Sequence, residues 1–376
     1  MSHFTVLVIG DNPEEQLAPY QENNMGDCPK EYLEFKDLES EYLEEYEDGT
    51  EERFVDSQGN HYSRYDDIFY REPTEKEYRE ICIGGTGHTG GKDGFSFTSK
   101  EWKDGKGYRP KVHFIPEGFR KEDIPNRQIY SSFEKYVEEW HGETEKDPAT
   151  NRYGYWENPN AKWDGYQIGG RWTGFFKLKN QIGDQKPPHK KGNPGLMTEE
   201  AQEGYADQCR KGDIDWEGIK EEGRKKANKR YDMYEKYFKS LESTFIPWST
   251  FIKRVKNNEI DIEEARQLYH SQPIMEHKKE VASQLHREHE DHNFVVWVDL
   301  DEFIGKSRET YAEEMASNKI QTFAIVKDGK WYEKGEMGWW AIVTNKKDEE
   351  EWDRQYAQLL GDLSDDTLLT LVDCHI

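Results

Sequence analysis

The fold of this chain is set first by Phe4-Thr5-Val6-Leu7-Val8-Ile9, which is followed by Gly10-Asp11-Asn12-Pro13. An apolar, β-branched run closed by turn-forming residues predicts a buried strand and then a turn. Pro13, Glu14 and Glu15 predict a short helix after the turn, because proline and acidic residues suit the first turn of a helix. A buried strand at a chain end needs a partner for its backbone hydrogen bonds, so another segment must pair with it.

The other end of the chain offers such partners. Residues 322–326 and 367–372 read as strands, and Asp328-Gly329 predicts a tight turn after the first of them. Between them, residues 348–360 carry apolar side chains at helical spacing, and Gly361 ends that helix. One sheet that holds both ends, with helices packed on one face, satisfies all these segments. We therefore expect an α+β fold with a ferredoxin-like core of sheet and helices built from both chain ends.

The middle of the chain is then a large mixed insertion. We expect residues 1–25 and 295–376 to form the core, residues 26–180 to form an aromatic and glycine-rich insertion with hairpins, and residues 181–294 to be mainly helical. Within these segments, residues 31–52 and 198–241 read as helices. Residues 294–298, Phe-Val-Val-Trp-Val, read as a strand.

Composition limits the classes of function. The net charge is −25, which repels phosphate backbones, so general nucleic-acid binding is not expected. The N-terminal segment does not resemble a signal peptide, and no apolar run reaches the ~18 residues of a membrane span. Cys28, Cys82, Cys209 and Cys374 are far apart and form neither a disulfide framework nor a zinc-finger pattern. These features favour a reducing cytoplasm and no membrane partner.

The most unusual stretch is Trp163-Asp164-Gly165-Tyr166-Gln167-Ile168-Gly169-Gly170-Arg171-Trp172-Thr173-Gly174-Phe175-Phe176. Aromatic rings beside an arginine can hold a nucleobase and its phosphate, and glycines let the rings stand clear of the backbone. A tight hairpin with aromatic core residues and an Arg171–Asp164 ion pair explains the same stretch. The predicted ligand-binding residues are Trp163, Asp164, Tyr166, Gly169, Gly170, Arg171 and Trp172.

A second candidate site contains potential metal ligands. His286 and His289 are three residues apart, and Asp299 and Asp301 follow the predicted strand at 294–298. Carboxylates just past a strand suit magnesium or acid–base chemistry, but a catalytic zinc needs about three protein ligands. A charged helix end and a loop or helix cap explain the same residues. The metal assignment is therefore Asp299, Asp301, His286 and His289.

Two further segments allow more than one interpretation. The acidic residues of 31–52 form either a solvated helix face or a docking surface for a basic partner. The glycine-rich run Gly84–Gly91 lacks the lysine of a phosphate-binding P-loop and favours a loop. At the C-terminus, Cys374 and His375 are neighbours on a strand and point to opposite faces, so a Cys–His catalytic pair is not expected.

Three blocks of the sequence resemble an uncharacterised family of tailed-bacteriophage and prophage proteins. The blocks are 1–8 with 16–20, 163–176, and 327–340 with 368–376. The resemblance implies a phage accessory protein in the bacterial cytoplasm, and it brings no activity. It agrees with one unit formed by both ends, because both ends carry the likeness.

The leading hypothesis is a phage-type protein that binds a small anionic or nucleotide-like ligand and so sequesters a host signal. One alternative is a metal-dependent hydrolase. Another is an acidic interaction protein, or nucleic-acid mimic, that binds a basic host factor. The sequence leaves open whether the chain is an enzyme, and it identifies no cofactor.

Overall fold

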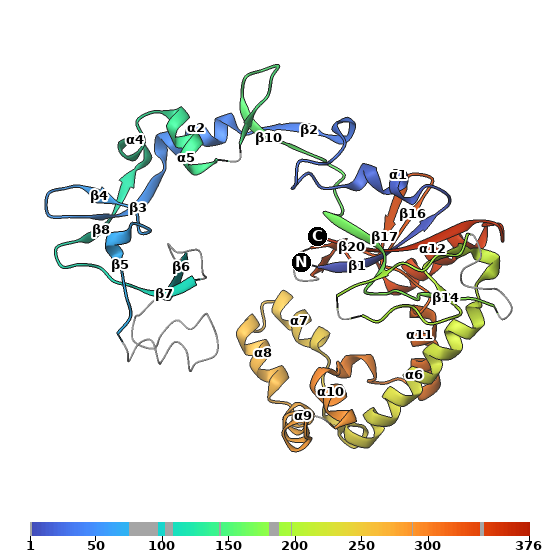
Figure 1. The fold of residues 1–376 in the computed structure, drawn as a ribbon. Helices are drawn as coiled ribbons and strands as arrows, with labels where there is room; N and C mark the ends of the chain where they lie inside the picture. The colour runs from blue at the N-terminus through green and yellow to red at the C-terminus, as the bar shows by residue number, and fades with distance from the viewer. Residues whose placement is uncertain are drawn as a thin grey trace. The chain divides into compact units, whose positions relative to one another are not determined.

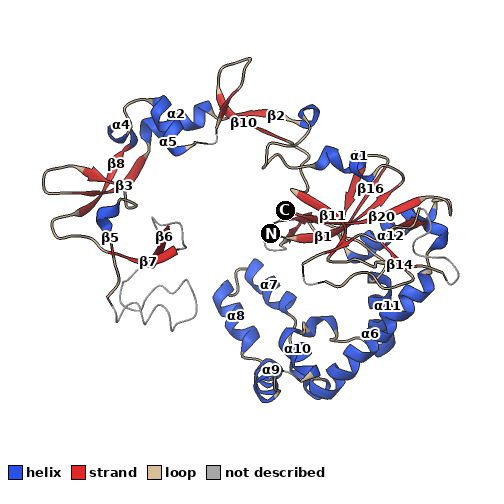
Figure 2. Ribbon diagram, in the orientation of Figure 1, coloured by secondary structure: helices blue, strands red, loops and turns tan. Residues whose placement is uncertain are grey.

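The structure is a computed structural model that describes residues 2–74, 97–101, 108–142, 144–179, 188–196, 198–287, 289–338 and 342–376. The chain divides into two compact units. The first contains Met1–Leu33 and Asn158–Ile376, and the second contains Glu34–Glu157. Helices and sheets occur in both units, which confirms the α+β class (Figure 2).

Both chain ends lie in the central sheet of the first unit. Strand β1 (His3–Ile9) pairs antiparallel with β20 (Leu368–His375), and Leu7 lies opposite Leu371. On its other side, β1 pairs in parallel with β16 (Ala324–Lys327). Figure 1 shows the two termini next to each other, where Ser2 and Ile376 exchange backbone hydrogen bonds of 2.9 and 3.0 Å. The predicted union of the two ends is confirmed.

The sheet extends outward from this pair. Strand β16 turns at Asp328-Gly329 into β17 (Lys330–Glu333), and both turn residues have positive φ, as the predicted tight turn requires. On the far side of β20 lie β11 (Gly165–Gly170) and β15 (Gln208–Arg210), both antiparallel to it. A short strand, β13 (Asn193–Pro194), pairs with β11.

The finer predictions for the core need correction. In the split βαβ motif of a ferredoxin-like core, another strand separates the connected strands, whereas β1 and β16 are direct parallel neighbours. Strands β11 and β15 come from residues 26–180 and 181–294, which were expected to lie outside the core. They join it because β20 is buried and its second edge also needs backbone partners.

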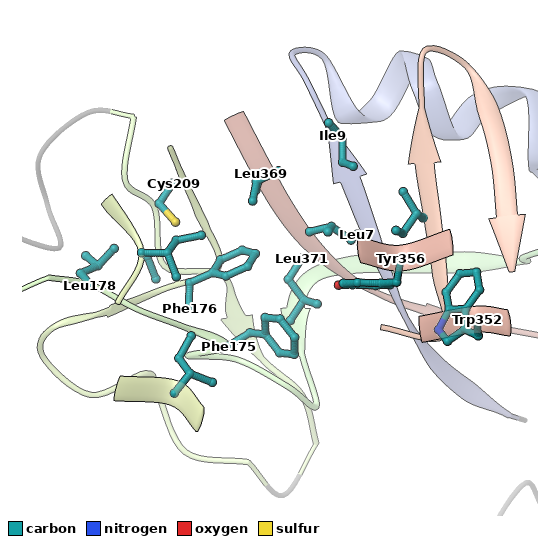
Figure 3. Packing of buried hydrophobic residues seen from close by; sticks show 14 residues of the cluster. Leu7, Ile9, Phe175, Phe176, Leu178, Cys209, Trp352, Tyr356, Leu369 and Leu371 are labelled. Carbon is teal, nitrogen blue, oxygen red and sulfur yellow. The ribbon is translucent and has the colours of Figure 1, made fainter. Parts of the chain in front are cut away.

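Alternating residues of the sheet form two apolar cores. Leu7, Ile9, Leu369 and Leu371 face one side and pack with Trp352 of helix α12 (Glu349–Gly361), as Figure 3 shows. The opposite side packs with helix α1 (Pro13–Leu17) and contains Phe4, Val6, Val8, Trp163 and Cys374. Helices therefore cover both faces of the sheet rather than the single face that was expected.

The rest of the first unit is largely helical. The helices that begin at Trp216 and Arg308 pack closely, and a Cβ on Gly223 would lie 2.9 Å from the Cα of Ala316. The helices are α6 (Trp216–Tyr237), α7 (Trp248–Lys256), α8 (Ile262–His270), α9 (Pro273–Gln284), α10 (Glu290–Trp297) and α11 (Arg308–Asn318). Two small two-stranded sheets pair β12 (Phe176–Lys177) with β14 (Tyr205–Ala206), and β18 (Glu336–Met337) with β19 (Val343–Thr344).

Two predictions in this region are wrong. Residues 294–298 lie in and just after helix α10, not in a strand, and Val295 packs among the surrounding helices. A short apolar run cannot by itself distinguish a strand from a buried helix. The helix predicted from residue 198 begins only at Trp216, where the Asp215 side chain accepts a hydrogen bond from the Gly218 backbone N–H.

The second unit is built from small sheets and short helices. The predicted acidic helix at 31–52 is shorter than expected: α2 (Glu39–Asp48) lies between β2 (Glu34–Asp37) and β3 (Thr50–Val55). Strand β3 and residues 61–62 form one of the hairpins expected within residues 26–180. The remaining elements are β4 (His61–Tyr62), β5 (Tyr70–Arg71), β6 (Phe97–Glu101), β7 (Tyr108–His113), β8 (Arg120–Pro125), α4 (Asn126–Ile129), α5 (Phe133–Trp140), β9 (Glu145–Lys146) and β10 (Tyr153–Glu157).

The glycine-rich run Gly84–Gly91 lies outside the described residues. Among the helices that the structure does describe, none combines the length and apolar composition needed to cross a bilayer.

Candidate functional site

Trp163 is part of the protein core rather than a stacking platform. Its side chain is buried, and its indole Nε1 donates a hydrogen bond of 3.2 Å to the backbone oxygen of Leu17. Tyr166 packs edge-on against it, with ring centroids 5.0 Å apart. Because the indole is enclosed by the core on the α1 side, Trp163 cannot stack on a ligand, and this assignment is wrong.

The other predicted aromatics do not converge on a pocket either. Tyr166 lies opposite Cys374 and packs with the core on the α1 side of the sheet. Trp172 packs against the core on the α12 side. The sheet therefore separates these two rings, and the second interpretation of the block, aromatic residues in the core, describes Trp163 and Tyr166 better.

Gly169 and Gly170 allow the end of β11 to approach two buried carboxylates. Both glycines have positive φ, at 81° and 56°. A Cβ at Gly169 would lie 2.7 Å from Oδ2 of Asp207, and one at Gly170 would lie 2.3 Å from Oδ2 of Asp373. The glycines are needed for this close approach rather than to clear space around aromatic rings.

Asp207 anchors the loop that follows β11. Its Oδ1 accepts backbone hydrogen bonds from Gly174 and Phe175, at 2.7 and 3.1 Å. Its Oδ2 accepts from the Thr173 hydroxyl and the Gly192 backbone N–H, both at 2.9 Å. The carboxylate is fully buried and surrounded by these donors, so its role is structural.

Arg171 lies on the same turn, next to the second carboxylate. Its backbone N–H donates a 2.9 Å hydrogen bond to Oδ2 of Asp373, and its side chain is exposed. The Arg171–Asp164 ion pair of the hairpin interpretation is not formed, and Asp164 contacts His375 instead. Within the described residues, no carboxylate forms an ion pair with the Arg171 guanidinium.

Two histidines from opposite ends of the chain lie side by side here. His3 and His375 are directly opposite each other on β1 and β20, and their ring centroids are 5.2 Å apart. Nδ1 of His3 is 2.8 Å from Oδ1 of Asp373, and Nδ1 of His375 contacts Oδ1 of Asp164. We call these four residues and Arg171 the paired-histidine site. It continues the sheet face whose apolar part includes Leu7 and Leu371 in Figure 3.

The Asp373 carboxylate lies behind the imidazoles. The side chains of His3 and His375 are 16% and 29% exposed, whereas that of Asp373 is 5% exposed. An ionised carboxylate can only accept a hydrogen bond, so Nδ1 of His3 carries the proton and its Nε2 is left to accept one. Nδ1 of His375 also faces a carboxylate, in an ion-pair contact with Asp164. This is the arrangement by which proteins orient a histidine for binding or for proton transfer.

Cys374 takes no part in this site. It lies on the opposite face of β20 from His375, fully buried in the core on the α1 side. Burial raises the pKa of its thiol well above the ordinary value, with the nearby Asp373 adding to the shift. The expectation that Cys374 and His375 do not form a catalytic pair is confirmed.

The predicted metal ligands are not brought together. His289 caps the start of α10, and His286 precedes it, whereas Asp299 and Asp301 follow the end of that helix. Eight helical residues separate the two ends by about 12 Å. In the described parts of the chain, no group of three or more His, Cys, Asp or Glu side chains is placed to hold a metal ion.

The two aspartates have local structural roles. Oδ1 of Asp299 accepts the Asp301 backbone N–H at 3.0 Å and caps the turn at Leu300–Glu302. Burial and the neighbouring Asp299 carboxylate raise the pKa of Asp301 above its ordinary value. This is the loop and cap explanation that the sequence also allowed.

Sequence reasoning found Asp164 and Arg171 but missed His3, His375 and Asp373 as site residues. The sequence feature that could have identified them is their position near the ends of two strands that were expected to share a sheet. Comparisons of the chain with family models, with curated proteins and with solved structures found no match.

Proposed function

We propose that the protein binds a small anionic, nucleotide-like ligand at the paired-histidine site. The observation that carries the proposal is the pair of adjacent, partly exposed imidazoles of His3 and His375, each positioned by a carboxylate. Arg171 donates its backbone N–H to Asp373, and its exposed side chain, which forms no ion pair with any described residue, carries a fixed positive charge on the adjoining turn. The proposed ligand class is the one the sequence suggested, but its contacts come from histidines and arginine rather than from stacked Trp163, Tyr166 and Trp172.

In this proposal the chain is a phage accessory protein of the bacterial cytoplasm that sequesters a nucleotide-like host signal. A guanidinium and a protonated imidazole bind phosphate oxygens through charge-assisted hydrogen bonds. The site lies at the end of a sheet face whose adjoining part is a packed apolar core, so its backbone is held in place. Binding therefore needs little rearrangement of the chain.

Replacing either histidine is expected to weaken binding of a phosphate-bearing probe. The probe is a thymidine dinucleotide with one phosphodiester, and thymidine is its uncharged counterpart. His3→Gln and His375→Gln should each weaken the dinucleotide about ten- to hundredfold, because a hydrogen bond to a charged group is worth about 1.5–3 kcal/mol. Isothermal titration calorimetry measures this, and His61→Gln, an exposed histidine of the second unit, is the control.

Gly165→Ala tests whether binding can be disturbed without a loss of stability. The added Cβ would lie 2.4 Å from Cε1 and Nε2 of His375, so the ring must move. We expect the dinucleotide affinity to fall while the melting temperature changes little. Gly361→Ala, where a Cβ meets no heavy atom within 4 Å, should change neither. If wild-type protein does not bind the dinucleotide, or binds thymidine equally well, the proposal is wrong.

A second candidate function is docking of a basic partner on helix α2. Six of its ten residues are acidic. Glu45 and Glu47 are engaged by His141 and Arg127, whereas Glu44 and Asp48 are exposed and form no ion pair with any described residue. A lysine or arginine side chain of a partner can pair with them.

Removing these two charges should weaken binding of an oligolysine probe. Glu44→Gln combined with Asp48→Asn is expected to reduce its affinity roughly threefold to tenfold, since an exposed ion pair contributes about 0.2–1 kcal/mol. The effect should shrink as salt is added. The control combines Glu351→Gln with Asp362→Asn, two exposed carboxylates of the first unit, and removes the same net charge. Equal losses in both variants would show that only total charge matters and would contradict docking at α2.

A further inference from the structure

We infer that the paired-histidine site hydrolyses phosphodiesters, with His3 and His375 as a general acid–base pair. The inference rests on the proposed function, because the ligand must bind there before it can react. It goes further by assigning a reaction and a substrate class to the site.

The geometry places two proton carriers on one small surface. The imidazole centroids are 5.2 Å apart, and the rings are tilted by 42° rather than stacked. Each Nδ1 faces a carboxylate, Asp373 for His3 and Asp164 for His375. Both Nε2 atoms therefore remain for proton exchange with a ligand, and a phosphate group that contacts both rings has a proton acceptor and a proton donor beside it.

Close packing holds these orientations. Asp373 is fixed by the Arg171 backbone N–H as well as by His3. Oδ1 of Asp164 and Nδ1 of His375 are both enclosed and contact each other as an ion pair, and neither has a hydrogen-bond partner among the described residues. The His375 ring also lies against Gly165, where a Cβ would collide with it. Asp373 and Asp164 are thus positioning residues for the two imidazoles.

The charges at the site favour a monoanionic substrate. With one imidazole protonated, that histidine and Arg171 carry two positive charges against the carboxylates of Asp373, Asp164 and the nearby Glu22. A phosphodiester adds one further negative charge to this group, and a phosphomonoester dianion adds two. Excess negative charge next to two buried or half-buried carboxylates is unfavourable, so the diester is the substrate class that fits.

The reaction balances without any further reagent. A water molecule gives a proton to Nε2 of the neutral imidazole while its oxygen forms a bond to phosphorus. The bond between phosphorus and the leaving oxygen breaks, and that oxygen takes the proton from Nε2 of the protonated imidazole. The products are a phosphomonoester and an alcohol. Proton exchange with solvent then restores the two imidazoles to their starting states.

Two thymidine diesters with different leaving groups test the mechanism. In the p-nitrophenyl ester of thymidine monophosphate the leaving group departs without protonation, whereas the thymidine dinucleotide needs a proton donor. His3→Gln and His375→Gln should each slow dinucleotide hydrolysis about 10²- to 10⁴-fold, the usual contribution of general acid–base catalysis. Only the variant that lacks the base should lose turnover of the p-nitrophenyl ester to the same degree.

His61→Gln is the control and should leave both rates unchanged. p-Nitrophenyl phosphate, a monoester, should be hydrolysed more slowly than the diester. The inference is overturned if wild-type protein hydrolyses neither diester above the buffer rate, or if both histidine variants keep the wild-type rates. Calorimetry with the dinucleotide then distinguishes failure of the inferred hydrolysis from failure of the proposed binding. Binding without hydrolysis leaves the proposed function standing and removes the inference, whereas absence of binding removes both.

Discussion

Asp207→Ala is expected to lower the free energy of unfolding by about 3–5 kcal/mol, because it leaves several buried donors without an acceptor. The Asp207 carboxylate accepts the backbone N–H groups of Gly174, Phe175 and Gly192 and the Thr173 hydroxyl. Thr173, Gly174 and Phe175 belong to the loop after β11, which also places Arg171, and Gly192 directly precedes β13. Domains are typically stable by only about 5–15 kcal/mol, so the loss is a large part of the total.

Urea denaturation measures this loss of stability. Asp207→Asn is a milder second variant, because it keeps one acceptor oxygen. The side-chain amide in that variant can keep its oxygen toward one pair of donors, but its NH₂ group faces the other donors and cannot accept from them. An intermediate loss of stability is therefore expected. Asp366→Ala removes a carboxylate whose side chain is 89% exposed and should change stability by less than about 0.5 kcal/mol. If Asp207→Ala is as mild as Asp366→Ala, the carboxylate does not anchor the loop.

The central sheet could be predicted from sequence because its signals are local. The apolar runs of β1 and β16 are closed by turn residues, and Asp328-Gly329 marks the β16–β17 turn. Helix α12 has apolar residues at helical spacing. Terminal strands that need backbone partners then place both ends in one sheet. The order of the strands did not follow from these signals, since pairing of β1 with β16 depends on packing across the whole unit.

The site could be predicted only in part, because the pairing register of β1 and β20 decides which of its side chains are neighbours. His3 and His375 face each other only if Leu7 lies opposite Leu371, and a slip of one residue would put them on opposite faces of the sheet. Trp163 and Arg171 drew attention because of their residue types. Composition does not distinguish a core indole from a stacking one, so Trp163 was assigned to the ligand although the α1 side of the sheet encloses it.

The same register underlies the last prediction, in which Leu7→Ala and Leu371→Ala each lower the free energy of unfolding by about 2–5 kcal/mol. Both side chains are almost fully buried in the core that Figure 3 shows, so each substitution removes apolar contacts and leaves a cavity. Thermal or urea denaturation of the single variants measures these losses. Leu196→Ala, at a position 90% exposed, should have almost no effect.

The double variant tests whether the two chain ends pair as β1 and β20 do. Leu7 and Leu371 are directly opposite each other. The loss in free energy of unfolding of the double variant should therefore differ from the sum of the two single losses by about 0.5–3 kcal/mol. Leu7→Ala combined with Phe251→Ala is the matched control, because Phe251 lies in a separate cluster with Ile260 and Ala265. That pair should be additive to within about 0.5 kcal/mol. Additivity of both pairs would mean that Leu7 and Leu371 are not neighbours, and His3 and His375 would then lose the register that brings their rings together.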